Sequence, residues 1–205
     1  MAVEPQIYEL LSQALVYPDE AFADRIQVRV QALSAPALWA RDITASLSDV
    51  SLEDLQTEHV RLFVNAYGGS PCLPYESVYT EGRMLGEAAY GVAAVYAQWG
   101  VEETSEMADH AAVELAFAAQ LARLGQLPEM EENRDLVRES LEAFERDHLR
   151  TWLPDLAAAL RAAAALPFYR AVGDGLAAVF GAKDVRGRAN RLASSSGDFF
   201  LELQT

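Results

Sequence analysis

Residues 107–124, MADHAAVELAFAAQLARL, show most clearly which kind of fold this chain adopts. Val113, Phe117 and Leu121 recur every four residues, which places them on one face of an α-helix, and Gly125 follows as a terminator. No stretch of the chain alternates apolar and polar residues with the β-branched content of strands. The sequence therefore predicts an all-α, single-domain bundle of about eight or nine helices.

Proline, glycine and capping residues divide the chain into these helices. Ser51 and Asp54 form a capping-box pattern, Asp19 is a candidate cap, and Pro36 and Pro167 suit first helical turns. Pro154 is expected to open a further helix. The helices are predicted at about 7–15, 19–33, 36–43, 52–63, 81–99, 107–124, 131–152, 154–166 and 167–180. Residues 1–181 would form the domain, and 182–205 a mobile C-terminal tail.

Composition excludes several classes of protein. The 205 residues carry a net charge of −15, which would repel nucleic acid and attract a basic partner. Cys72 is the single cysteine, so an intramolecular disulfide is impossible. Met1–Pro5 lacks the features of a secretory signal, and charged residues and prolines interrupt the most apolar stretch, 153–169. A cytoplasmic protein without membrane insertion is expected.

The segment Asn65–Pro74 is the longest internal loop and the first candidate for a functional site. Its Tyr, Pro and Gly residues form turns, and long loops inside compact domains are often functional. Phe63, Tyr67, Tyr75 and Tyr79 flank or occupy it. Such aromatic residues pack in the core or line a cleft for an apolar peptide.

A second candidate is the polar cluster Asp109, His110 and Glu114. His110 and Glu114 lie one helical turn apart, so both could ligate a metal if His59 or Glu58 completed the set. The alternative is structural: Asp109 caps the helix, while His110 and Glu114 hydrogen-bond a neighbouring loop. No nucleophile elbow or phosphate-binding loop is present to indicate another enzyme.

Four segments together resemble the TorD/DmsD/NarJ family of molybdoenzyme chaperones. They are Glu58–Phe63 (EHVRLF), Pro74–Tyr79 (PYESVY), Asp109–Leu115 (DHAAVEL) and His148–Pro154 (HLRTWLP), in the family's order. Two features depart from it: Tyr75, followed by the acidic Glu76, stands where a Trp is frequent, and Val64-Asn65-Ala66 replaces Gly-Pro. The Tyr75-Glu76-Ser77 form resembles the branch that serves nitrate reductase or dehydrogenases of the dimethyl sulfide and ethylbenzene type.

The resemblance implies an all-helical chaperone that is not an enzyme and holds no cofactor. Its partner would be the apo catalytic subunit of a molybdopterin-dependent oxidoreductase, often bound at its twin-arginine signal peptide and retained until the cofactor is inserted. A monomer and a homodimer both remain open. Two alternatives also remain: a metal-dependent enzyme, and a helical adaptor with another client.

The resemblance also suggests which residues contact the client. They would line a groove formed by Tyr75, Glu76, Ser77, Tyr79, Asp109, His110 and Glu114, supported by Glu58, Leu62, Phe63 and Pro74. The acidic members would pair with the two arginines of a signal peptide, and the aromatic members would shield its apolar segment from water.

Overall fold

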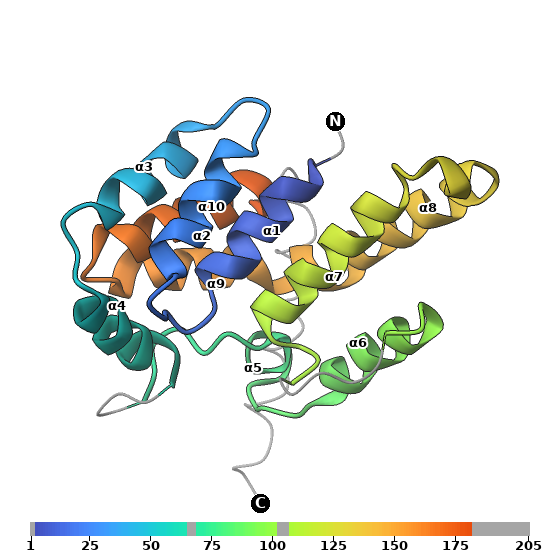
Figure 1. Cartoon of the computed structure of the whole chain (residues 1–205). Helices are drawn as coiled ribbons and strands as arrows, with labels where there is room; N and C mark the ends of the chain where they lie inside the picture. The colour runs from blue at the N-terminus through green and yellow to red at the C-terminus, as the bar shows by residue number, and fades with distance from the viewer. Residues whose placement is uncertain (1–2, 65–68, 102–106, 182–205) are drawn as a thin grey trace, which may run out of the picture.

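A computed structural model describes residues 3–64, 69–101 and 107–181 (Figure 1). Its elements are α1 (Pro5–Ala14), α2 (Phe22–Gln31), α3 (Leu38–Leu47), α4 (Leu52–His59), η1 (Val60–Val64), α5 (Glu76–Glu81), α6 (Glu87–Gln98), α7 (Ala111–Leu124), η2 (Pro128–Asn133), α8 (Arg134–Phe144), η3 (Glu145–Leu149), α9 (Arg150–Ala163) and α10 (Pro167–Phe180). η1 and η3 are π-helical turns and η2 is a 3-10 helix. The predicted all-α fold is confirmed, since the described residues contain no strand. The predicted tail, 182–205, lies outside the described residues.

Helix α1 lies at the centre of the bundle and packs on α2, α7 and α10 (Figure 1). Tyr8, Leu10 and Leu11 on α1 are completely buried, so two of its faces meet the core. The Ser12 hydroxyl donates a hydrogen bond of 2.7 Å to the carbonyl oxygen of Ala112 at the start of α7. This contact fixes α1 against α7 although the two residues are 100 positions apart.

Helices α9 and α10 form a hairpin, and α3 packs on α10 (Figure 1). Two glycines of α10 permit the close approach. A Cβ atom on Gly173 would lie 3.0 Å from the carbonyl oxygen of Ala157, and one on Gly175 would lie 2.7 Å from a ring carbon of Trp39. Only glycine fits such contacts without movement of a neighbour.

Several predicted helix ends are confirmed. The Ser51 hydroxyl accepts the backbone N–H of Asp54 at 3.0 Å, so Ser51 caps α4. Pro167 is the first residue of α10. Two starts were wrong: α2 begins at Phe22 because the Asp19 carboxylate caps a preceding turn through the N–H of Ala21, and α3 begins two residues after Pro36.

Three further helix boundaries were predicted wrongly. In each case a break in the backbone or the packing of side chains in the core determined the boundary, and the periodicity of apolar residues did not. The helix predicted at 81–99 begins only at Glu87, since Gly82 adopts a positive φ of 73° and ends a separate helix, α5, which was not predicted. The helix predicted at 107–124 begins at Ala111, because Asp109 and His110 pair with the loop before α5. Pro154 lies inside α9 rather than opening it. Its missing N–H removes one helical hydrogen bond, while Trp152, Leu153 and Leu156 keep this stretch in the core.

Candidate functional site

Three of the four sequence segments meet at one point of the fold, between α5, the start of α7 and the α8–α9 rod. We call the side chains that gather there the polar junction: Glu76, Ser77, Asp109, Glu114 and His148. The first four are at most 3% exposed, and the His148 side chain is 15% exposed. Buried carboxylates need internal partners, because leaving water costs them several kcal/mol each.

Ser77 and Asp109 form the centre of the junction. The Asp109 carboxylate accepts the Ser77 hydroxyl at 2.6 Å and the Ser77 backbone N–H at 3.0 Å, both on Oδ2. Backbone pairing reinforces the contact: the N–H of Glu76 donates to the carbonyl oxygen of Asp109 at 2.9 Å, and the N–H of Ala111 to that of Pro74 at 2.8 Å. The segment that leads into α5 is thereby held against the start of α7.

His110 caps α7, and Asp109 does not. The Nδ1 atom of His110 accepts the backbone N–H of Ala112 at 3.1 Å, which requires that nitrogen to carry no proton. The ring of Tyr75 meets that of His110 edge-on at 5.2 Å between centroids. The structural alternative is correct in part: His110 rather than Asp109 caps the helix, Asp109 bonds the segment before α5, and Glu114 bonds Trp152 of α9 rather than a loop.

The π-helical turn η3 supplies the partner of Glu76. His148 lies in this turn, and its Nδ1 is 2.9 Å from Glu76 Oε2. The Thr151 hydroxyl lies 3.4 Å from the other oxygen of the same carboxylate. π-helical turns are rare and occur often at functional sites. Here the wider turn brings His148 to a buried carboxylate.

Glu114 is the most deeply buried acid of the junction. The Trp152 indole N–H donates to Glu114 Oε2 at 3.2 Å, while Glu114 Oε1 and Asp109 Oδ1 have no hydrogen-bond donor among the described residues. Burial, the charge of Glu76 and that of Asp109 raise the pKa of Glu114 well above its usual value, although the Trp152 bond opposes this. A hydrogen bond with the Glu76 side chain raises the pKa of Glu114 further, because it favours the protonated carboxyl.

Glu58 stands apart from the junction and ties α4 to the turn between α9 and α10. Its carboxylate accepts two hydrogen bonds from Arg61, at 2.6 and 2.8 Å, and the backbone N–H of Ala165 at 2.6 Å. Burial alone would raise the pKa of Glu58, but the bonds from Arg61 and Ala165 lower it overall. Glu58 therefore carries its charge and stabilises the start of α10.

The other predicted supporting residues, Leu62, Phe63 and Pro74, are also buried. Of the predicted contact residues, Tyr75 and Tyr79 alone are half-buried, and Tyr79 packs on Trp152 with 5.4 Å between ring centroids. The predicted contact residues are brought together, whereas Phe63 packs with His59 and Tyr169; Glu76, Ser77, Asp109 and Glu114 lie beneath the surface rather than along an open groove. A role for them in client binding stays a prediction.

The residues that the site prediction missed are His148, Thr151 and Trp152. Their side chains complete the hydrogen bonds of Glu76 and Glu114. The segment His148–Pro154 contributes a motif of the resemblance. Neither its spacing nor its composition connected it to Glu76, since 72 residues separate Glu76 from His148.

The structure does not assemble the metal site considered as an alternative. His59 lies among aromatic rings, 4.8 Å from that of Phe63 and 5.4 Å from that of Tyr17 between centroids. Burial, together with the charge of His110, lowers the pKa of His59 to about 4. Across residues 3–64, 69–101 and 107–181, no three His, Cys, Asp or Glu side chains gather closely enough to hold a metal.

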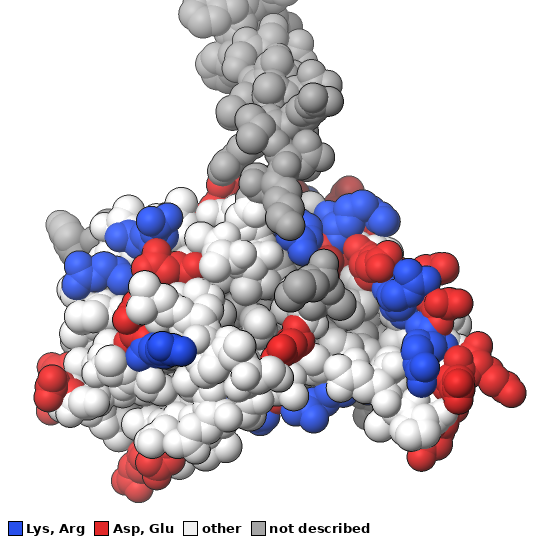
Figure 2. Space-filling model, turned by 90° about the horizontal axis from the view of Figure 1, so that it is seen from above, with Lys and Arg blue, Asp and Glu red and all other residues white. Residues whose placement is uncertain are grey.

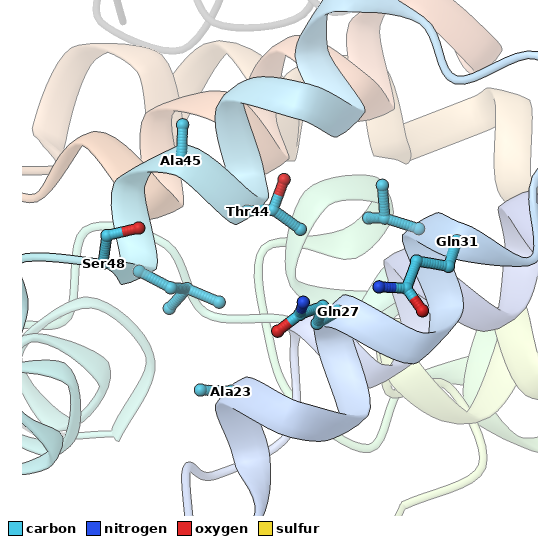
Figure 3. Close-up of a pocket in the computed structure, with 8 residues that line it drawn as sticks. Ala23, Gln27, Gln31, Thr44, Ala45 and Ser48 are labelled. Atoms are coloured by element: carbon cyan, nitrogen blue, oxygen red, sulfur yellow. The ribbon is translucent and has the colours of Figure 1, made fainter.

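An open cleft of about 460 Å³ lies away from the junction, between α2 and α3 (Figure 3). Uncharged polar side chains line it, namely Gln27, Gln31, Thr44 and Ser48, over the apolar Val30 and Leu47. The face seen in Figure 2 carries acidic and basic side chains most densely at the end formed by α7 and α8. None of the described helices is long and apolar enough to cross a membrane.

Comparison with known proteins agrees with this geometry. The bundle is similar to the crystal structure of a redox enzyme maturation protein from Archaeoglobus fulgidus, with a TM-score of 0.64 and 24% identity over 86% of this chain and 95% of that one. The fold is thus the same all-helical bundle. Residues 21–158 match the family described as nitrate reductase delta subunit, and the chain belongs to that family.

One curated relative extends the comparison. The chain is 31% identical over 127 residues to chaperone protein TorD of Photobacterium profundum. That match covers 58% of this chain and 59% of the relative's length. Both relatives are named for chaperoning or maturation and neither for an enzymatic reaction, in agreement with the predicted family and with a protein that is not an enzyme.

Proposed function

We propose that this chain is a chaperone for the apo catalytic subunit of a molybdopterin-dependent oxidoreductase. It binds that subunit in the cytoplasm, at an N-terminal twin-arginine signal segment, and retains it until the cofactor has been inserted. The observation that carries the proposal is the family match over residues 21–158, which contains all four motif segments. The TorD relative, named as a chaperone, supports it.

The chemistry of the chain suits such a client. A signal segment combines two arginines with an apolar stretch, so it needs carboxylates and a surface that shields apolar side chains from water. The net charge of −15 attracts the arginines within the range that is left by screening from dissolved salt. In this proposal Tyr75 and Tyr79 contact the client, while Glu76, Ser77, Asp109, His110 and Glu114 hold these two tyrosines in place from below.

Calorimetric titration tests the proposal. The purified chain is titrated with the twin-arginine signal peptide of a molybdopterin oxidoreductase encoded next to it, and with a peptide in which both arginines are alanine. We expect saturable binding to the first peptide and at least tenfold weaker binding to the second, since two charge-assisted contacts are lost. Equal binding to both peptides would contradict recognition of the arginines.

A variant pair locates the surface. Tyr75→Ala should weaken peptide binding, whereas Tyr17→Ala, which removes a tyrosine that is 52% exposed outside the loop, should not. If neither peptide binds the unaltered chain, capture of the whole apo subunit decides. Capture would show that the chaperone grips the body of its client and not the signal, and no capture would overturn the proposed function.

A further inference from the structure

The outer face of α6 is apolar from Tyr90 onward, beyond the exposed Glu87 of its first turn, although it faces solvent. Tyr90, Ala94 and Ala97 recur at helical spacing on this face, and all three are exposed, Tyr90 by 73%. The opposite face packs on the bundle through Tyr96, whose ring lies 4.6 Å from that of Phe117. Residues 88–101 contain no charged side chain. A helix that is apolar on all sides normally has both faces covered.

The residues that lead into α6 extend the apolar surface. Met84 is 40% exposed and Leu85 is 59% exposed. Leu85 also has a φ of 57°, in the left-handed region that side chains rarely adopt, and such strain is concentrated at functional segments. We call Met84, Leu85, Tyr90, Ala94 and Ala97 the α6 face.

Helix α8, in contrast to α6, carries charged side chains on its outer side. Arg138 pairs there with Asp135 at 3.0 Å and with Glu142 at 3.7 Å. The same end of the molecule is densely charged in Figure 2. The α6 face therefore differs from the outer side of α8, and large exposed apolar patches mark interaction sites.

The end of the described chain and helix α6 both lie beside the start of α9 and the turn that precedes it. At the end of α10, the Phe180 ring lies 5.8 Å from the Arg150 guanidinium carbon, and Arg150 approaches the carbonyl oxygen of Val179 at 3.4 Å. Two residues before Arg150, His148 reaches α6: a Cβ atom on Gly91 would lie 3.8 Å from its ring. The 24 residues after Gly181 can span roughly 80 Å when extended, far more than this separation.

The sequence of residues 182–205 complements the body of the chain. Four of the 16 basic residues and three of the 31 acidic residues lie in it, which leaves residues 1–181 with a net charge of −16. The basic residues are Lys183, Arg186, Arg188 and Arg191, and the apolar run Phe199-Phe200-Leu201 follows. The basic side chains are attracted to the net negative charge of residues 1–181. The apolar side chains near the end of the segment can be buried against an apolar surface.

We propose that residues 182–205 fold back on their own chain and cover the α6 face, with Phe199, Phe200 and Leu201 against Leu85 and Tyr90. Covalent attachment places this segment at a high effective concentration, so modest contacts suffice. The inference does not depend on the proposed function. If the chaperone function and the covering of the α6 face are both correct, residues 182–205 occupy an apolar surface that a client could bind only by displacing them.

Hydrogen exchange tests the covering of α6. We compare the full chain, a chain ending at Gly181, and a full-length Phe199→Ser/Phe200→Ser/Leu201→Ser variant. Both altered chains should exchange the amides of residues 87–98 roughly tenfold faster than the full chain, while residues 22–31 in α2 exchange at an unchanged rate. Equal exchange of residues 87–98 in all three chains would overturn the proposal.

Crosslinking tests the occupant directly. In the full chain, Tyr90→Cys with Phe200→Cys should form a disulfide within one chain under mild oxidation. Leu136→Cys with Phe200→Cys is the matched control, because Leu136 is 58% exposed on α8 and should not form one. Crosslinks that join two chains, or α6 protection that disappears on dilution, would show that a second copy covers the face, and the intramolecular proposal would be wrong.

Discussion

The Ser77 hydroxyl and the Asp109 carboxylate meet at 2.6 Å with both residues completely buried. The same oxygen also accepts the Ser77 backbone N–H. One carboxylate therefore joins the start of α5 to the segment that precedes α7. Helix α5 has six residues, too few to be stable alone. Its position therefore depends on tertiary contacts, and the two bonds to Asp109 are among them.

The first prediction concerns this contact. Asp109→Ala leaves the hydroxyl and N–H of Ser77 without an acceptor, and we expect the free energy of unfolding to fall by about 3 kcal/mol. Chemical denaturation followed by circular dichroism measures the change. Asp42→Ala, at an exposed position of α3, serves as the control and should change it by less than about 0.5 kcal/mol.

The second prediction concerns the protonation of Glu114. Because its pKa is raised in the folded chain, the folded state binds a proton that the unfolded state has lost above its ordinary pKa. This group therefore stabilises the fold fully in acid, and its contribution declines as pH rises through the raised pKa. Glu114→Gln imitates the protonated form and keeps an acceptor for Trp152.

Denaturation of Glu114→Gln and of the unaltered chain at pH 5 and pH 8 measures this effect. The variant should gain stability relative to the unaltered chain as pH rises. Glu142→Gln, an exposed residue of α8, should show no such trend. A constant difference between Glu114→Gln and the unaltered chain at both pH values would refute a raised pKa.

The third prediction has the opposite sign. His59 is buried in its neutral form with a pKa of about 4, against 6.5 for the free side chain. Between these values the unfolded state binds the extra proton, so stability falls as pH drops from about 6.5 to about 4, by as much as about 3 kcal/mol. His59→Asn, which does not titrate, should lose less stability over this range, as measured by thermal unfolding at pH 7 and pH 5.

The fourth prediction compares two glycines. Gly175→Ala places a Cβ atom 2.7 Å from Trp39, so α3 and α10 must separate, at a cost of about 2 kcal/mol. Gly91→Ala meets nothing closer than 3.8 Å within a helix and should stabilise the chain by about 0.5–1 kcal/mol. Melting temperatures of the two variants should move in opposite directions, and a shared direction would contradict the packing described.

The fold class and most helices could be predicted from the sequence because periodic apolar residues and caps are local signals. Val113, Phe117 and Leu121 needed no partner to indicate a helix, and Ser51 marked the start of α4. The break at Gly82 was missed because no run of turn-forming residues announces it. Helix α9 continues through Pro154 since tertiary packing of Trp152 and Leu153 outweighs the lost hydrogen bond.

The candidate site could be predicted only as a set of residue types. Asp109, His110 and Glu114 were selected as a polar cluster in an apolar helix, and they do lie together with Glu76 and Ser77. Their burial was not visible, because exposure depends on the π-helical turn that brings His148 across from a distant segment. Glu58 was placed in the same site, but its contacts with Arg61 and Ala165 hold a different corner of the bundle.

The contact between Ser12 and Ala112 has a consequence for the order in which the chain is made. Helix α1 leaves the ribosome well before α7, the helix on which it packs, which follows about 100 residues later. At roughly 5–20 residues per second, that delay is on the order of 5–20 s. During synthesis this protein presents an uncovered apolar helix of its own, and so passes through a stage in which it needs the same protection from aggregation that chaperones give to unfinished chains.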